Sequence, residues 1–135
     1  MFEGEYLNGK ENGNGKEYAL YGGGNKSFLR FEGKYLDVKR NGKGKELFDN
    51  GKVLFEGEYL NGKIWNGKGY AIYGYETFEI KEGKGYVKKY YPSGRLEYEG
   101  EYLDGERWNG KLFRRDFSDD MIEEEYKNGI NISLW

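Results

Sequence analysis

The stretch Phe55-Glu-Gly-Glu-Tyr-Leu-Asn-Gly62 decides the fold of this 135-residue chain, because it returns repeatedly along the sequence. Copies begin near residues 2, 31, 55, 78, 98 and 122, at steps of 29, 24, 23, 20 and 24 residues, and those at 78 and 122 are degraded. Repetition at such a period is typical of solenoids, in which each unit is one supersecondary element. We therefore expect a single repeat domain over residues 1–135, built from about six units.

A second motif follows the first in each clear unit, as in Asn12-Gly-Asn-Gly15, Asn41-Gly-Lys-Gly44 and Asn66-Gly-Lys-Gly69. Both motifs alternate as β-strands do, with rings and glycines on one face and charged residues on the other. We infer that each ring lies across the bare backbone of neighbouring glycines, which explains why glycine is tolerated inside a strand.

Turn signals separate the predicted strands. Asn-Gly occurs nine times and Asp-Gly once, and both suit the positive φ angles of type I′ hairpin turns. We expect Asn50-Gly51 to form a two-residue turn and the Asn-Gly-Lys connections to be longer.

This pattern resembles the MORN-repeat family: aromatic-Glu-Gly-Glu-aromatic, then Asn-Gly-Lys, then Asn-Gly-x-Gly. The resemblance covers nearly the whole chain, although Tyr stands where Trp is common and the first unit is longer. It implies consecutive β-hairpins stacked into an elongated, open antiparallel sheet. We accordingly predict an all-β fold, a single-layer twisted trough or rod of hairpins.

Composition favours a folded protein with a thin core. Only 36% of residues are hydrophobic and 34% are charged, but 19% are aromatic, including 14 Tyr and 8 Phe. Tyrosine rings can pack on a sheet while their hydroxyls stay in contact with water.

The residue inventory disfavours catalysis. The chain has no Cys and no His, which removes thiolate metal sites and the commonest general base. The many glutamates recur at strand positions expected to face solvent, where a carboxylate does not become a useful acid. We therefore expect no enzyme activity, catalytic residue, metal or cofactor.

Charge and hydropathy limit the partners. The formal charge is −2, with 22 basic and 24 acidic residues that alternate along the chain, so we expect no nucleic-acid partner. Anionic lipid is disfavoured for the same reason, the best candidates being the basic pairs Lys39-Arg40, Lys88-Lys89 and Arg114-Arg115. Without a signal peptide or a membrane-spanning apolar run, we expect a soluble, cytoplasmic protein.

Six aromatic residues are candidates for binding a partner: Tyr6, Tyr35, Tyr59, Tyr102, Trp65 and Trp108. The four tyrosines belong to the ring ladder, which either lines a binding groove or forms the core. The two tryptophans occupy matching places where units three and five carry one extra residue. We expect them on loops, either as anchors for a partner or folded back as caps.

The C-terminal segment Ile130-Asn-Ile-Ser-Leu-Trp135 alternates and is predicted to be the last strand. Its open edge could pair with a second copy into a homodimer, which makes Ile130, Ile132, Leu134 and Trp135 candidate edge residues; the alternative is a plain cap.

Repetition without catalytic residues favours a protein-interaction or scaffold module that binds a peptide or helix of a protein partner on its aromatic face. The alternatives are a phospholipid-binding module, which the MORN resemblance suggests, and a carbohydrate-binding trough.

Overall fold

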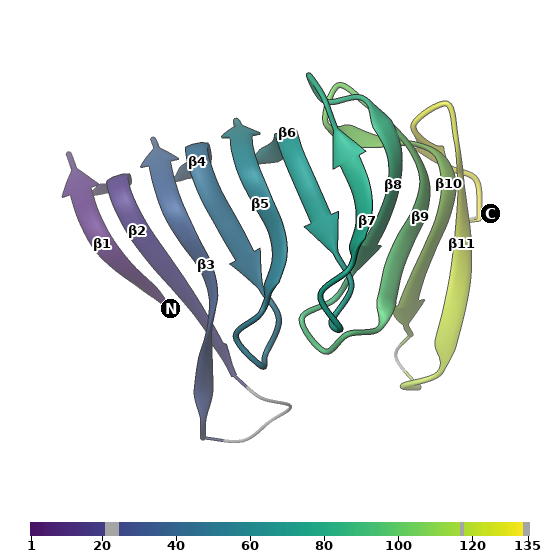
Figure 1. The fold of residues 1–135 in the computed structure, drawn as a ribbon, viewed down its shortest axis with the longest axis horizontal. Helices are drawn as coiled ribbons and strands as arrows, with labels where there is room; N and C mark the ends of the chain where they lie inside the picture. Colours follow the sequence, from purple (N-terminus) through teal and green to yellow (C-terminus); the bar gives the residue numbers. More distant parts are fainter. Residues whose placement is uncertain (21–24, 117, 134–135) are drawn as a thin grey trace.

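The computed structural model describes residues 1–20, 25–116 and 118–133. Within these residues the chain forms twelve strands: β1 (Phe2–Leu7), β2 (Lys10–Leu20), β3 (Ser27–Leu36), β4 (Lys39–Leu47), β5 (Val53–Leu60), β6 (Lys63–Tyr70), β7 (Glu76–Ile80), β8 (Gly85–Tyr90), β9 (Leu96–Leu103), β10 (Glu106–Arg115), β11 (Met121–Lys127) and β12 (Ile130–Asn131). Figure 1 shows β1 to β11 side by side in chain order. The predicted all-β, open antiparallel architecture is confirmed.

The array is divided into two sheets, where we had predicted one. Strands β1 to β7 form a seven-stranded sheet, and β8 to β12 form a five-stranded sheet. At the junction, the pairing between the ends of β7 and β8 is reduced to an isolated bridge between Lys81 and Lys84. This is the degraded fourth unit, where the motif keeps its first ring, Phe78, but has Ile80 at the position of the following glycine.

Two kinds of turn alternate along the array, and their assignment differs from our prediction. The Asn-Gly-Lys connections are the two-residue turns: Asn61 and Gly62 have φ angles of 49° and 85°, as type I′ requires. Asn50-Gly51 instead belongs to a longer loop, in which the Gly51 N–H bonds the Phe48 carbonyl at 2.9 Å. In that loop only Gly51 is left-handed, as in a type I turn with a bulge.

The rings lie over glycine backbone, as the sequence predicted. A Cβ atom added to Gly44 would lie 2.7 Å from Cζ of Phe31, and one added to Gly67 would lie 2.8 Å from Cζ of Phe55. Phe31 also meets the tyrosine of the next unit edge-on, with Phe31 and Tyr59 centroids 5.2 Å apart, and Phe55 stacks on Phe78 at 5.9 Å. These contacts bury Phe31 and Phe55 completely.

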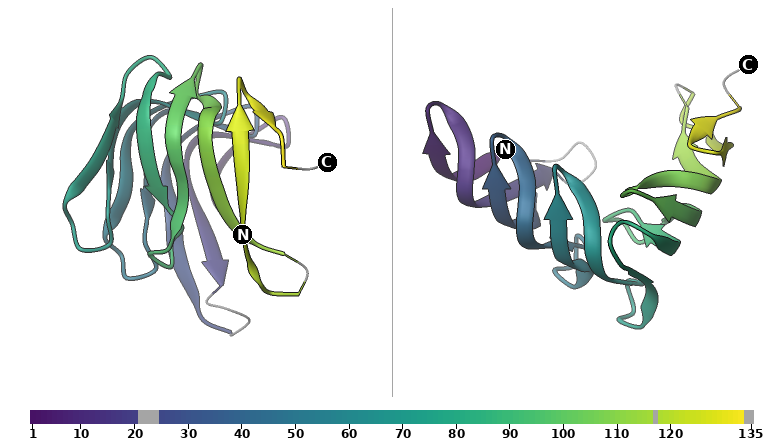
Figure 2. Two further views of the ribbon diagram at one scale, coloured as in Figure 1. Left: turned by 90° about the vertical axis from the view of Figure 1, so that its right-hand side faces the viewer. Right: turned by 90° about the horizontal axis from the view of Figure 1, so that it is seen from above.

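The array bends sharply at the junction between the two sheets, which Figure 2 shows as two arms at an angle. Three strands separate β4 from β8 in the order of the array, a distance of about 19 Å between them in a flat sheet. Nevertheless, the Asp49 N–H after β4 bonds the Pro92 carbonyl after β8 at 2.9 Å. The bend therefore brings the loops together and covers the ring-lined face with the chain's own residues, among them Phe48, Leu54 and Tyr90.

Replacing Gly44 tests the packing of rings on glycine. We expect Gly44→Ala to lower the free energy of unfolding by about 1–3 kcal/mol, because its methyl group overlaps the Phe31 ring. Gly62→Asn is the control, since nothing lies within 4 Å of a Cβ there and Asn tolerates left-handed backbone. Urea denaturation of both variants gives the comparison, and equal stabilities would contradict the packing.

Candidate functional site

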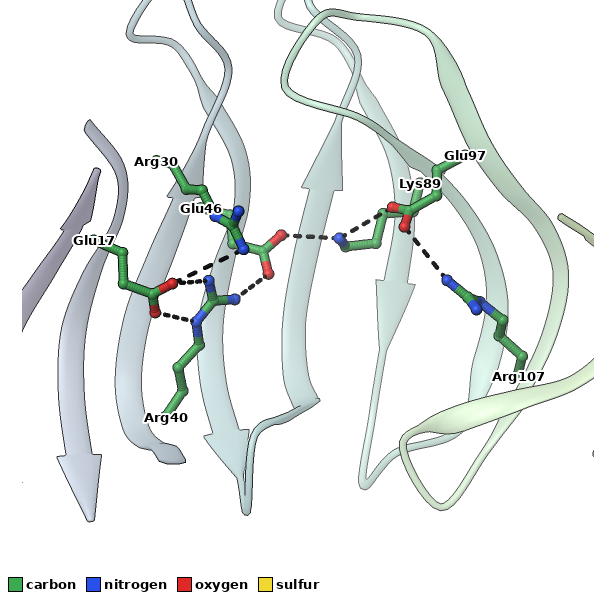
Figure 3. Close-up of polar contacts among 7 residues, drawn as sticks. All are labelled: Glu17, Arg30, Arg40, Glu46, Lys89, Glu97 and Arg107. Carbon is green, nitrogen blue, oxygen red and sulfur yellow. Dashed lines mark hydrogen bonds and ion pairs between the residues drawn. The ribbon is translucent and has the colours of Figure 1, made fainter. Parts of the chain in front are cut away.

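The ring-lined face holds a chain of charged side chains in addition to its apolar core (Figure 3). Arg40 bridges two carboxylates, with Nε 2.8 Å from Glu17 and Nη1 2.8 Å from Glu46. Lys89 continues the chain at 2.9 Å from Glu46 and 3.5 Å from Glu97. We call this set, completed by Arg107, the charged network: Glu17, Arg40, Glu46, Lys89, Glu97 and Arg107.

The network residues occupy strand positions on the ring-lined face that carry neither a ring nor a glycine. Glu46 pairs across the strands with both Phe31 and Phe55, so it shares their face. The Arg40 guanidinium lies 4.1 Å from the centroid of the Phe31 ring, where a cation–π interaction adds to its ion pairs. Strand alternation places Glu17 and Glu46 on the face of Gly15 and Gly44, but it does not show which cations they meet there.

The protonation behaviour of the network argues against acid–base catalysis. Burial raises the pKa of Glu46, but Lys89 and Arg40 outweigh burial and hold that pKa below its ordinary value. For Lys89, burial lowers the pKa, but the neighbouring Glu46 and Glu97 outweigh burial, so the pKa lies above its ordinary value. Both groups are thereby fixed in their charged forms, whereas a general acid or base needs a pKa near the working pH.

The network spans the junction between the two sheets and connects strands on the two sides of the bend. Glu46 belongs to β4 and Lys89 to β8, and their side chains are only 13% and 16% exposed. Since Glu46 meets two cations and Lys89 two carboxylates, the desolvation of these charges is largely offset. We assign the network a structural role.

The structure places the four candidate tyrosines in different environments. Tyr35 and Tyr59 are 6% and 3% exposed, so their rings belong to the core. Tyr102 is half-buried, whereas Tyr6, at the free end of the ladder, is 58% exposed.

The two candidate tryptophans lie in strands and not on loops, so that expectation was wrong. Trp65 is the bulged residue of β6, and Trp108 occupies the same place in β10. The Trp65 carbonyl accepts the Gly83 N–H at 2.8 Å, and a Cβ added to Gly83 would lie 2.5 Å from the indole. Trp108 meets Gly129 similarly, so each indole covers the glycine of the next turn.

The C-terminal candidates are only partly within the described residues. Ile130 lies in the two-residue strand β12 and is 61% exposed, whereas Ile132 lies in a turn and is 39% exposed. The predicted last strand is therefore shorter than expected over these residues. Leu134 and Trp135 lie outside the described residues.

Four of the six basic residues singled out for lipid binding form ion pairs. Arg40 and Lys89 belong to the charged network, and Arg114 pairs with Glu124. Arg115 lies 3.5 Å from Asp119.

A groove of about 770 Å³ lies on the opposite face and crosses β1 to β6. Its floor is a row of six glycines that face one another in register across the strands: Gly4, Gly15, Gly33, Gly44, Gly57 and Gly67. One rim is a row of alternating charges, also in register: Glu3, Lys16, Glu32, Lys45 and Glu56. The other rim includes Lys34, Lys43 and Glu58. We call this feature the glycine groove.

The repeat itself carries a signal that could have revealed the glycine groove. Each Glu-Gly-Glu motif lies beside a Gly-x-Gly motif of the same unit, as Gly57 lies beside Gly67. The two rims lie two strand positions apart, so the groove is about 7 Å wide. An α-helix, with a diameter of about 10 Å, does not fit into it. Along its floor the groove spans five strand spacings, about 24 Å, or about seven residues of an extended chain.

Comparisons with known proteins leave the chain without an assigned family: no protein-family model matches it, and no curated protein matches its sequence. Among the described residues, no cluster of three acidic side chains could hold a metal ion. The same part of the chain contains no helix able to cross a membrane.

Removing Lys89 tests the structural role of the network. We expect Lys89→Met to lower the free energy of unfolding by about 2–4 kcal/mol, because Glu46 loses one of its two cations while remaining buried. Lys68→Met is the matched control, since Lys68 is 50% exposed beside Glu76 and its loss should cost less than about 1 kcal/mol. Similar losses in the two variants would rule out a special role for the buried chain of charges.

The pH dependence of stability gives a second test. Because the pKa of Glu46 in the folded protein lies below the ordinary 4.5, its contribution is present above that pH and is lost as pH falls through the lower, folded-state value. Glu46→Gln should therefore be less stable than the wild type at pH 7, and the difference should shrink below about pH 4.5. Thermal melts at stepped pH measure it, and a difference that widens in acid would contradict the assignment.

Proposed function

We propose that the protein is a non-catalytic interaction module that holds an extended segment of a protein partner in the glycine groove. The observation that carries the proposal is the register of six glycines beneath two charged rims, which leaves a continuous groove across three hairpins. The segment would lie across the strands, with small or apolar side chains on the glycine floor and polar groups toward the rims.

This proposal moves the binding surface from the ring-lined face to the opposite one. On the ring-lined face, Tyr35 and Tyr59 are buried by neighbouring rings and by the network, so a partner would have to displace the core to reach them. On the groove face, the rim side chains Lys43 and Glu58 are exposed. A pre-formed groove limits the conformational entropy lost on binding.

The rims provide charges of both signs, which favours a polypeptide over a phosphate-rich ligand. Four lysines and four glutamates line the groove: Lys16, Lys34, Lys43, Lys45, Glu3, Glu32, Glu56 and Glu58. Such a balance offers donors and acceptors to a peptide backbone but little net attraction to an anionic surface.

Peptide selection followed by NMR tests the proposal. Peptides selected from a random display library should shift the amide signals of Gly33, Gly44 and Gly57 in a sample labelled on glycine. The signals of Gly51 and Gly74, in loops at the end of the strands, should not move. Shifts confined to the loops, or a selection that yields no binder above background, would contradict the proposal.

A charge reversal on the rims gives the matched comparison. We expect Lys43→Glu/Lys45→Glu to weaken binding of the selected peptides by about threefold or more, since each surface contact contributes roughly 0.2–1 kcal/mol. Lys52→Glu/Lys127→Glu makes the same change in net charge at exposed positions outside the groove. Equal weakening in both variants would mean that only the overall charge matters.

A further inference from the structure

A second unpartnered feature of the groove face is a line of leucines at its turn end. Leu7, Leu36 and Leu60 directly precede the two-residue turns of the first three hairpins, and they are 58%, 55% and 40% exposed. Each follows an inward-facing tyrosine, so its side chain lies on the outer face with the groove rims. Each also pairs across its hairpin with a lysine: Lys10, Lys39 and Lys63.

The fold itself does not require leucine at these positions. The two degraded units have lysine at the same place before their turns, Lys81 and Lys127. Both turns nevertheless keep left-handed first residues, with Glu82 and Asn128 at φ of 50°. None of the three leucines belongs to the core or packs against it. These three exposed apolar side chains occupy equivalent places in consecutive hairpins and so form one line along the outer face.

From these observations we infer that the leucines and lysines form a docking strip for an acidic amphipathic α-helix of a protein partner. The strip comprises Leu7, Leu36, Leu60, Lys10, Lys39 and Lys63. It lies beside the glycine groove and rests on the proposed interaction function, to which it adds a second point of attachment.

The spacing of the leucines matches a helix that lies along the array. Successive leucines occupy equivalent places two strands apart, which is about 9.6 Å. Residues seven apart on one side of a helix are about 10.5 Å apart. Over the three leucines the two repeats differ by only about 2 Å, so one helix of about 15 residues can place a side chain on each.

The charge of the strip selects an acidic helix. Lys10 lies 3.2 Å from Asp37, and Lys63 lies 2.7 Å from Glu106. Because these side chains are more than 40% exposed, the lysines can exchange such surface partners at little cost. Glutamates flanking the apolar side of the helix would meet one lysine in each hairpin.

A designed helix tests the strip. The probe is a fluorescent peptide of about 21 residues, or three heptads, with Leu at heptad positions and Glu on their flanks, titrated against the full chain by anisotropy. We expect saturable binding that weakens at least tenfold in Leu36→Gln/Leu60→Gln. Leu20→Gln/Ile130→Gln is the control, since these residues are as exposed, at 61% each, but lie away from the strip. A version of the peptide with Lys in place of Glu should bind at least tenfold more weakly.

Several results would overturn the strip. They are no saturable binding, equal binding of the basic peptide, and self-association of the chain, seen by light scattering, that the Gln pair abolishes. Loss of helix binding in Lys43→Glu/Lys45→Glu would also overturn it, because the helix would then lie on the groove. Extended peptides selected for the groove should bind Leu36→Gln/Leu60→Gln normally, so failure of the strip and failure of the groove are distinguishable.

Discussion

The contact between an aromatic ring and bare glycine backbone is the constraint on which the rest of the structure depends. On one face, the absence of side chains at Gly44 and Gly67 lets Phe31 and Phe55 approach the sheet closely. Phe31 then meets Tyr59 of the next hairpin and Phe55 stacks on Phe78, which gives a chain with only 36% hydrophobic residues a continuous core. On the other face, the same glycines form the floor of the groove. Core and groove therefore lie on the two sides of the same strand positions.

The charged network adds what the ring ladder alone does not supply. A ladder of hairpins contacts only its nearest neighbours along the array, whereas Glu46 and Lys89 connect β4 to β8. The Glu46–Lys89 contact requires the break between β7 and β8, because an unbroken flat sheet would keep β4 and β8 too far apart for it. The bend covers the middle of the ring-lined face with residues of the chain itself, among them Phe48 and Leu54, whereas Tyr6 at the free end stays exposed.

The elements of the fold could be predicted from the sequence because the relevant information is local. The alternation of rings, glycines and charges in residues 55–62 gives both the strand and its buried face. Repetition then gives the number and order of hairpins. The turn types were assigned the wrong way round, because Asn-Gly occurs both at Asn61-Gly62, a turn, and at Asn66-Gly67, which lies inside β6. Propensity alone does not distinguish these two places.

The candidate site was less predictable because it depends on contacts between distant residues. Alternation places Glu46 on the face of Gly44, two positions earlier, but it does not identify the cation Lys89, which lies 43 positions away. The register of the six floor glycines likewise requires knowledge of which strands are neighbours. Lys81 and Lys127, by contrast, are visible in the sequence as departures from the leucine of the repeat. Only the structure shows that both precede turns of the same kind as those after the leucines.

The most direct test of ring packing on glycine is an NMR measurement on the glycine α-protons under the rings. The α-protons of Gly15, Gly44 and Gly67 should be shifted upfield by ring currents and show nuclear Overhauser effects to Phe2, Phe31 and Phe55 respectively. The α-protons of Gly51 and Gly74, which lie in loops away from the ladder, should lie at ordinary positions. Ordinary shifts at all five glycines, without contacts to the rings, would contradict the packing on which the core depends.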